Sequence, residues 1–402
     1  MSRTVVIIGA GRSGRGMLGE LYSRSGFHII FADKDKETLK CMQEQQYYTV
    51  GMTNLDTNEE INRKITGFSC IDVSEKAEYY RLLNEADIIS TAILPRDFDA
   101  VIQDLAEAIK IRYREEKVNT PMLITLGANY VGMKSRFSKG IERLLTKEEA
   151  EWAKEHVALL QSIVNRKNLL PGRGEETEDK LRVIGDNKGV LQVERHPDLE
   201  AWTDLPEWMI LKENLEAAMA VKIWSNNVVQ GSMAAVGMYK GYTDTYSCAM
   251  DEDISKWAFY AGEEGYEAVR REFGLPKRSE ADAKKMVGVF QNAEFKDSCY
   301  RIIRNPIRKL ARNERFIGAA LCALEHGVVP YFILKCCAYM FLYQNGEEPE
   351  SVELQKEIKT EGVEKAIEKY CQLDLQKKDE KIIADLLKNF YLDIAGKNPV
   401  DL

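Results

Sequence analysis

A glycine-rich turn near the start of the chain constrains its fold more than any other feature. The apolar residues 5–8 run into Gly9, Gly11 and Gly14, which have the G-x-G-x-x-G spacing, and a helical pattern follows. The first glycine permits a tight turn, the second lets the backbone approach a pyrophosphate, and the third lets the helix pack on the strand. The helix start offers free N–H groups to the phosphates. This order of strand, turn and helix predicts a dinucleotide-binding Rossmann unit.

An acidic residue ends the second predicted strand, which covers residues 27–32. Asp33 follows the glycine motif by about twenty residues, where such folds place a carboxylate that accepts hydrogen bonds from the ribose. A carboxylate there would repel a 2′-phosphate, so the sequence favours NAD over NADP. Lys34 and Lys36 can each meet a phosphate, which leaves NADP open.

Short apolar runs alternate with helical patterns in the first part of the chain. We predict strands over residues 4–8, 27–32, 87–91 and 121–126, helices over 14–25 and 97–112, and extra short strands between 49 and 73. Strands separated by helices predict a parallel sheet with right-handed crossovers. Residues 147–164 have a helical pattern, residues 170–186 are typical of a loop or hairpin, and residues 191–194 of a strand.

Beyond residue 207 the pattern becomes almost wholly helical, with glycine and proline between the helices. We therefore predict an α/β fold with two domains. An N-terminal Rossmann domain, doubly wound around a mostly parallel sheet, covers residues 1–195. A mostly α-helical C-terminal domain covers residues 196–402.

Charge and cysteine spacing argue against several classes of protein. The 402 residues include 56 Lys and Arg against 64 Asp and Glu, a net charge of −8. Nucleic acids and anionic membranes attract positive faces, so we expect neither as a partner. The eight cysteines include no C-x-x-C pair and no Cys–His cluster with zinc spacing. We expect reduced thiols, a cytoplasmic protein and no metal.

Five stretches carry motifs of a known enzyme family. They are residues 9–19 with 31–33, 86–92 with Asn129, 193–202, 222–237 and 296–310, so they span most of the chain. Together they resemble the long-chain polyol (mannitol) dehydrogenases, which include the mannitol-1-phosphate 5-dehydrogenases. The resemblance implies a Rossmann domain, a helical domain and an active site between them. It adds Arg12, Ser13 and Ala92 to the NAD-binding residues, and implies a monomer, with weak self-association left open.

The family's Lys-x4-Asn-x2-His signature occurs here in an altered form. Lys222 and Asn227 match it, and Gln230 replaces the histidine. At about 100° per residue, these three side chains fall within an arc of about 140° on one helix face, which Asn226 shares. A further family asparagine, at the end of a Rossmann strand, corresponds to Asn129.

By the resemblance, these residues would transfer a hydride from a secondary alcohol. Lys222 can take the hydroxyl proton if desolvation and a nearby nicotinamide ring lower its pKa. Asn129 and Asn227 can each aim an NH₂ group at the developing alkoxide. Gln230 can orient the substrate by hydrogen bonds but cannot titrate near neutral pH. We predict an NAD-dependent oxidoreductase that interconverts a polyol phosphate, such as mannitol 1-phosphate, with a ketose phosphate.

A basic cluster bears on whether the substrate is phosphorylated. Arg308 and Lys309 match the family and lie close in sequence to Arg301 and Arg304. A phosphate dianion that leaves water needs such cationic partners. The alternative is that acidic neighbours, such as Asp297 and Glu314, hold the cluster as a structural helix face.

Three other functions remain open. The first is a dehydrogenase of an unphosphorylated polyol or a uronate. The second is an NAD-binding sensor or scaffold with altered or lost catalysis, which is suggested by Gln230, by Ala128 where the family has an acidic residue, and by Asn165-Arg166 with a displaced Pro171. The third is a short-chain-type dehydrogenase, since Tyr130 and Lys134 form a Tyr-x3-Lys pattern, but Gly132 between them weakens a helix there.

Overall fold

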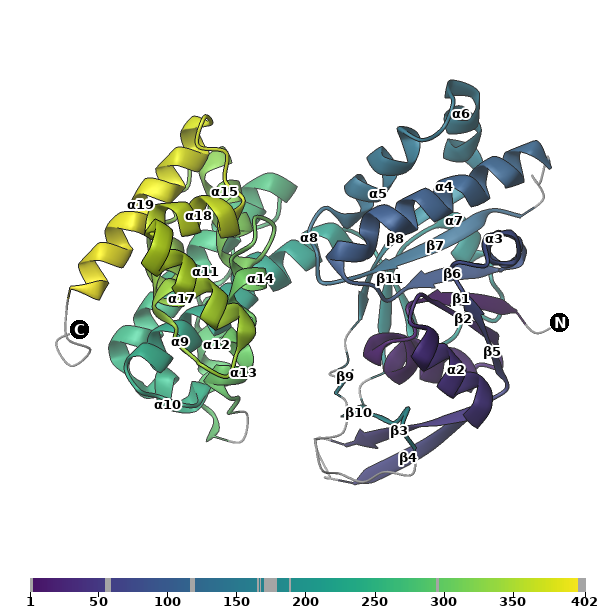
Figure 1. Ribbon diagram of the computed structural model, residues 1–402, viewed down its shortest axis with the longest axis horizontal. Coiled ribbons are helices and arrows are strands. Elements are labelled where there is room, and N and C mark those ends of the chain that lie inside the picture. Colours follow the sequence, from purple (N-terminus) through teal and green to yellow (C-terminus); the bar gives the residue numbers. More distant parts are fainter. Residues whose placement is uncertain are drawn as a thin grey trace. The chain divides into compact units, whose positions relative to one another are not determined.

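A mostly parallel sheet organises the first half of the chain (Figure 1). The computed structural model describes residues 3–54, 59–115, 120–164, 166, 168–169, 179–187, 189–293 and 296–396. Within them the larger sheet has eight strands in the order β12-β11-β8-β7-β6-β1-β2-β5. Its strands are β1 (Thr4–Ile8), β2 (His28–Asp33), β5 (Phe68–Asp72), β6 (Ile88–Thr91), β7 (Met122–Gly127), β8 (Val157–Val164), β11 (Leu191–Glu194) and β12 (Met209–Lys212). Neighbours run parallel except β8 and β11.

The side chains of β1 alternate between two apolar layers. Val5 and Ile7 belong to the layer that contains Met17, whereas Val6 and Ile8 belong to the layer that contains Phe98. This alternation is what a strand covered on both faces requires. The covering helices and short turns are η1 (Gly14–Gly19, a π-helix), α1 (Glu20–Arg24), α2 (Lys36–Gln45), α3 (Lys76–Glu85), η2 (Pro95–Asp97), α4 (Phe98–Arg114), α5 (Met133–Glu142), α6 (Lys147–His156) and α7 (Pro197–Glu200).

A second, four-stranded sheet lies beside the helix that follows the glycine turn. Its strands are β3 (Tyr47–Thr53), β4 (Glu60–Thr66), β9 (Asn168–Leu169) and β10 (Val183–Asp186), in the order β4-β3-β10-β9. The extra strands expected between residues 49 and 73 are confirmed as β3, β4 and β5. In the stretch 170–186, β10 pairs with β9 in antiparallel fashion, and residues 170–178 lie outside the described residues.

The helix expected over residues 147–164 is wrong in its second half. A capping box between Thr146 and Glu149 starts α6, which ends at His156. The rest, Val157–Val164, is strand β8, inserted between β7 and β11. Its apolar residues fill both faces of a covered strand, and such a run has no alternation that distinguishes it from a buried helix.

The second half of the chain is helical. Its elements are α8 (Leu215–Val221), η3 (Lys222–Asn226, a π-helix), α9 (Asn227–Tyr239), α10 (Thr245–Met250), α11 (Glu252–Phe273), α12 (Glu280–Gly288), η4 (Val289–Gln291), α13 (Cys299–Ile303), α14 (Pro306–Leu310), α15 (Arg315–Glu325), α16 (Tyr331–Ala338), η6 (Tyr339–Leu342), α17 (Pro349–Glu361), α18 (Val363–Cys371) and α19 (Lys378–Ala395). One apolar core joins most of them, from α9 to α19. Across the described residues, no helix combines the length and apolar character that crossing a membrane requires.

The chain divides into two compact units, Met1–Glu216 and Ala217–Leu402, here called the N-terminal and C-terminal units. This division lies later than the expected one after residue 195. The reason is β12, which forms where we expected helix and pairs in parallel with β11 at the edge of the large sheet.

A buried carboxylate ties the helix after the glycine turn to the smaller sheet. Glu20 is fully buried, and its carboxylate lies 3.0 Å from Arg166, 2.9 Å from Arg63 on β4 and 3.1 Å from Arg24. Arg166 also donates to the carbonyl oxygen of Gly16 at 2.7 Å. Arg166 is buried too, so removal of the carboxylate would take away a charge that compensates a desolvated cation.

We therefore expect Glu20→Gln to destabilise the N-terminal unit by about 3 kcal/mol, because it breaks a buried ion pair from one side. Glu44→Gln is the matched control, since Glu44 forms an exposed pair with Lys40, and such a pair is worth at most about 1 kcal/mol. Urea unfolding measures both changes. Equal losses of stability in the two variants would show that the buried cluster does not hold the unit together.

Candidate active site

The glycine turn connects the end of β1 to the following helix with almost no free space. Gly9 has a φ angle of +105°, and a Cβ atom there would lie 2.5 Å from the carbonyl oxygen of Ala92. A Cβ atom on Gly14 would lie 1.8 Å from the carbonyl oxygen of Gly9. Both positions therefore require glycine, and Ala92, at the end of β6, forms the wall of the turn.

Gly11 differs from these two glycines because it faces open space. A Cβ atom there would meet no atom within 4 Å. Gly11 and Arg12 are exposed and Ser13 is half-buried, so the first turn of the helix presents its backbone to this space. The turn lies between β1 and β6, which continue into opposite halves of the sheet. Such switch points are where doubly wound sheets bind ligands.

Asp33 points from the end of β2 toward the turn. Its carboxylate accepts hydrogen bonds from the backbone N–H of Ala10 at 2.6 Å, of Lys34 at 2.7 Å and of Asp35 at 3.0 Å. The ammonium of Lys34 lies 2.5 Å from Asp97, and that of Lys36 lies 3.1 Å from Asp72. Both lysines that left NADP open are thus paired with carboxylates.

The residues of the Lys-x4-Asn-x2-Gln pattern lie where a helix changes its hydrogen bonding. Lys222 begins the π-turn η3, and the N–H of Asn227 donates to the carbonyl oxygen of Lys222. An i→i+5 bond places Asn227 above Lys222, much as an α-helix places residue i+4. The arc expected for a regular α-helix is therefore too wide. Lys222, Asn227 and Gln230 are all half-buried, whereas Asn226 is exposed.

The partial burial of Lys222 changes the acidity of its ammonium group. Burial lowers the pKa of its ammonium group from the ordinary value of a lysine. A lysine with a lowered pKa holds a larger fraction of neutral amine near neutral pH and can accept a proton.

The predicted residues fall into two groups. The glycines, Asp33, Ala92 and Asn129 belong to the N-terminal unit, whereas Lys222, Asn227, Gln230, Arg308 and Lys309 belong to the C-terminal unit. Asn129 is exposed just beyond the C-terminal end of β7, and the half-buried Ala128 precedes it. Asn165 and Pro171 lie outside the described residues, while Arg166 bonds to Glu20 and Gly16.

Acidic neighbours hold much of the basic cluster. The guanidinium of Arg308 lies 2.6 Å from Glu314, and that of Arg301 pairs with Asp297. Lys309 is only 5% exposed and donates from Nζ to the carbonyl oxygen of Ile302. Burial, reinforced by the charge of Arg315, lowers the pKa of Lys309 to about 6.

Sequence analysis missed Arg315 in this cluster. Its side chain is 11% exposed, lies 3.7 Å from Glu314, and has an Nε atom without a hydrogen-bond partner. A Cβ atom on Gly231, the residue after Gln230, would lie 3.1 Å from Cδ of Arg315. A charged residue that opens the apolar helix α15 was the available signal.

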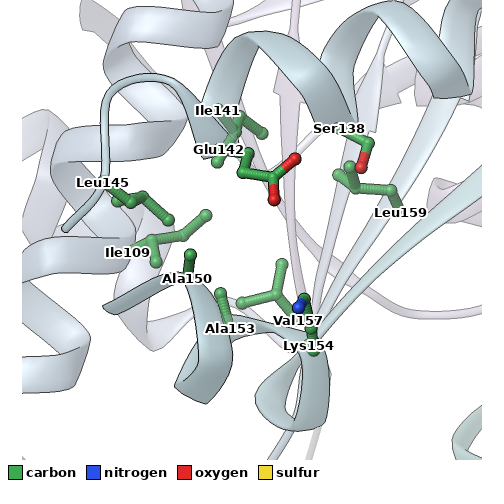
Figure 2. A pocket seen from close by; sticks show the side chains of 10 residues that line it. All are labelled: Ile109, Ser138, Ile141, Glu142, Leu145, Ala150, Ala153, Lys154, Val157 and Leu159. Carbon is green, nitrogen blue, oxygen red and sulfur yellow. The ribbon is translucent and has the colours of Figure 1, made fainter. Parts of the chain in front are cut away.

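A separate hollow lies in the N-terminal unit (Figure 2). It has a volume of about 140 Å³ between α4, α5, α6 and β8. Its walls are mainly apolar, with Ser138, Glu142 and Lys154 as polar groups. None of the predicted site residues lines it.

Comparison with known proteins covers nearly the whole chain. Residues 3–187 match the mannitol dehydrogenase Rossmann domain, and residues 214–394 match the mannitol dehydrogenase C-terminal domain. The chain belongs to the mannitol dehydrogenase family. It is thus an oxidoreductase of the polyol dehydrogenase class, which acts on a CH–OH group, and its N-terminal unit is an NAD-binding Rossmann domain.

Two relatives of the same name agree with this assignment. The chain is 28% identical over 369 residues to mannitol-1-phosphate 5-dehydrogenase of Bacillus velezensis, covering 91% of this chain and 95% of that protein. It is 26% identical over 371 residues to the enzyme of the same name from Geobacillus stearothermophilus, covering 92% and 95%.

Solved structures show the same fold. Mannitol 2-dehydrogenase of Pseudomonas fluorescens, solved with NAD and D-mannitol, aligns with a TM-score of 0.69 and 14% identity over 100% of this chain and 93% of that one. A substrate-free D-sorbitol dehydrogenase aligns with a TM-score of 0.64 and 13% identity over 99% and 94%.

The buried Lys309 gives a stability prediction with a definite sign. Its pKa falls from 10.5 to about 6 in the folded state, so the unfolded chain binds more protons between these values and the free energy of unfolding rises with pH. We expect Lys309→Met to flatten this rise by up to about 1.4 kcal/mol per pH unit.

Urea unfolding of the C-terminal unit between about pH 6.5 and 8.5 measures this slope. Lys359→Met, at an exposed position of α17, is the control that should keep the wild-type slope. Parallel curves for wild type and Lys309→Met would show that Lys309 remains charged in the folded protein.

Proposed function

We propose that this enzyme interconverts a polyol phosphate, such as mannitol 1-phosphate, with the corresponding ketose phosphate by metal-free hydride transfer to NAD. The observation that carries the proposal is the half-buried Lys222 with its lowered pKa, one helical turn from Asn227. A desolvated amine beside an amide donor is what proton removal from a secondary alcohol requires.

NAD would bind at the glycine turn. Gly9 and Gly14 shape the turn, and Gly11 leaves the space that a pyrophosphate would fill. Arg12 and Ser13 would offer backbone N–H groups at the helix start. Asp33 would accept hydrogen bonds from the ribose hydroxyls, and Ala92 would border the cofactor. When bound, NAD supplies the acceptor for the hydride.

NAD is proposed over NADP because of charge. The carboxylate of Asp33 would repel a 2′-phosphate, and the nearby Lys34 and Lys36 are already paired with Asp97 and Asp72.

The chain's own residues would handle the proton and the oxygen of the substrate. The neutral amine of Lys222 would accept the hydroxyl proton as the carbonyl forms. Asn227 and Asn129 would each donate a hydrogen bond to the oxygen while it carries negative charge. Gln230 would orient the polyol through its amide, which both donates and accepts hydrogen bonds.

Arg308 is the proposed partner of the substrate phosphate. This guanidinium has five N–H donors, is exposed, and makes one hydrogen bond to Glu314. Lys309 would support the cluster from its buried position and would not contact the phosphate, because its Nζ already bonds to the carbonyl oxygen of Ile302. The names of the two relatives support a phosphorylated substrate.

An unphosphorylated polyol or a uronate is the second candidate. It is favoured by the internal pairing of Arg308 with Glu314 and by the burial of Lys309, both of which reduce the positive charge left for a phosphate.

We expect NADH oxidation with fructose 6-phosphate or another ketose phosphate. Its kcat/KM should be at least tenfold above that for the dephosphorylated ketose, and the kcat/KM with NADH should exceed that with NADPH. A panel of ketose phosphates, ketoses and keto-uronates measures this. Arg308→Gln should raise KM for the phosphorylated substrate only. Arg81→Gln, on the surface of α3, should change KM for neither the phosphorylated nor the unphosphorylated substrate.

Each other outcome has a definite meaning. Turnover confined to unphosphorylated sugars would contradict the phosphate proposal and assign Arg308 and Lys309 to structure. Tight NADH binding without turnover on any member of the panel would favour the non-catalytic sensor. The replacement of the family histidine by Gln230 would then be the first cause to test.

A further inference from the structure

The π-turn η3 decides which asparagine lies above Lys222. In a regular α-helix the carbonyl oxygen of Lys222 would bond to the N–H of Asn226, the i+4 residue. In the structure it accepts from Asn227 instead. The extra residue in the turn therefore places Asn227, in place of Asn226, next to Lys222 along the helix face. A π-turn of this kind persists only where its surroundings favour it.

Helix α11 packs its backbone directly against this turn. A Cβ atom on Gly265 would lie 1.8 Å from the carbonyl oxygen of Trp224. A Cβ atom on Gly262 would lie 2.4 Å from Val229 on α9. The two glycines let α11 approach the widened turn more closely than any side chain would permit.

One buried hydroxyl connects the turn to α11. Ser225 is fully buried, and its Oγ donates to the carbonyl oxygen of Gly262 at 2.9 Å. The same Oγ accepts a hydrogen bond from Nη2 of Arg278 at 3.1 Å. Ser225 therefore satisfies a carbonyl on one side and a guanidinium on the other.

Arg278 is itself held in place. Its side chain is only 10% exposed, its Nη1 lies 2.8 Å from Glu263, and its guanidinium stacks 3.8 Å from the ring centre of Tyr266. Glu263 and Tyr266 both lie on α11. The hydrogen bond from Arg278 to Ser225 therefore fixes η3 relative to α11 from a second direction.

We infer that Ser225 and Arg278 are positioning residues that hold the π-turn and so direct Lys222 and Asn227 to the same reacting oxygen. Neither touches the substrate in this account. The inference rests on the proposed function, because it assigns the two residues a role only through Lys222 and Asn227. If the turn relaxed to a regular α-helix, Asn227 would rotate away from Lys222 by about one residue, or about 100°.

The test compares Ser225→Ala with Ser232→Ala, a buried serine about two turns further along α9. NADH oxidation with fructose 6-phosphate should show at least a tenfold lower kcat for Ser225→Ala, with KM for NADH unchanged. Ser232→Ala should stay within twofold of wild type. Because a smaller folded fraction would also lower the apparent kcat at unchanged KM, the rates are compared per mole of folded enzyme, as determined by circular dichroism.

A second variant and a second measurement guard against misfolding. Arg278→Met retains an apolar side chain beside Tyr266 but removes the donor to Ser225 and the ion pair with Glu263, so it should lower kcat in the same direction. Amide hydrogen exchange over residues 222–230 should be faster in both variants and unchanged in Ser232→Ala. Wild-type kcat and wild-type exchange in either folded variant would overturn the inference.

The outcomes also separate this inference from the proposed function. An active Lys222→Ala enzyme would refute the proposed base and leave nothing to position. An inactive Lys222→Ala enzyme, together with fully active Ser225→Ala and Arg278→Met enzymes, would overturn only the positioning role.

Discussion

The contact between Gly14 and the carbonyl oxygen of Gly9 is the constraint on which the N-terminal unit depends. Because residue 14 is a glycine and has no Cβ atom, the helix after the turn can lie directly against the end of β1. This contact fixes where the helix starts and leaves the space in front of Gly11 open. The buried Glu20, the first residue after the π-helix η1, then joins the same helix to the smaller sheet.

Both units contain a π-turn at the segment to which we assign a role in the proposed function. A π-turn follows the glycine motif over Gly14–Gly19, and another carries Lys222–Asn226. In each case a glycine allows a close backbone contact at the turn: Gly14 approaches the carbonyl oxygen of Gly9 in the first unit, and Gly265 approaches that of Trp224 in the second. Departures from regular helix are rare and often mark functional sites, so their occurrence at these two places agrees with the assignment of the family.

Local patterns predicted much of this structure. The glycine spacing and the alternating strands and helices were sufficient for the Rossmann fold, because each feature depends on neighbouring residues. The sequence predicts helix where β8 forms, because a doubly covered strand has no polar face. It also predicts helix where β12 forms, because the place of β12 at the sheet edge depends on β11. Neither fact is local in the sequence.

The candidate site was predictable only in its residue types. The pattern named Lys222, Asn227 and Gln230, but a regular helix gave the wrong arc, because the π-turn depends on α11, some forty residues away in the chain. The burial of Lys309 was equally hidden, since its helix α14 is covered by other helices, among them α15, α17 and α18. Arg308 and Lys309 matched the family, yet their ion pair and burial could be known only from the fold.

The most direct test of the central claim is the pH dependence of kcat/KM for oxidation of mannitol 1-phosphate by wild type and Lys222→Ala. A buried Lys222 with a lowered pKa predicts that wild-type activity rises through an apparent pKa below 10.5. The variant should lose about a hundredfold to ten-thousandfold in rate, the range of general-base catalysis. A Lys222→Ala enzyme with the wild-type rate and the wild-type pH profile would contradict the account.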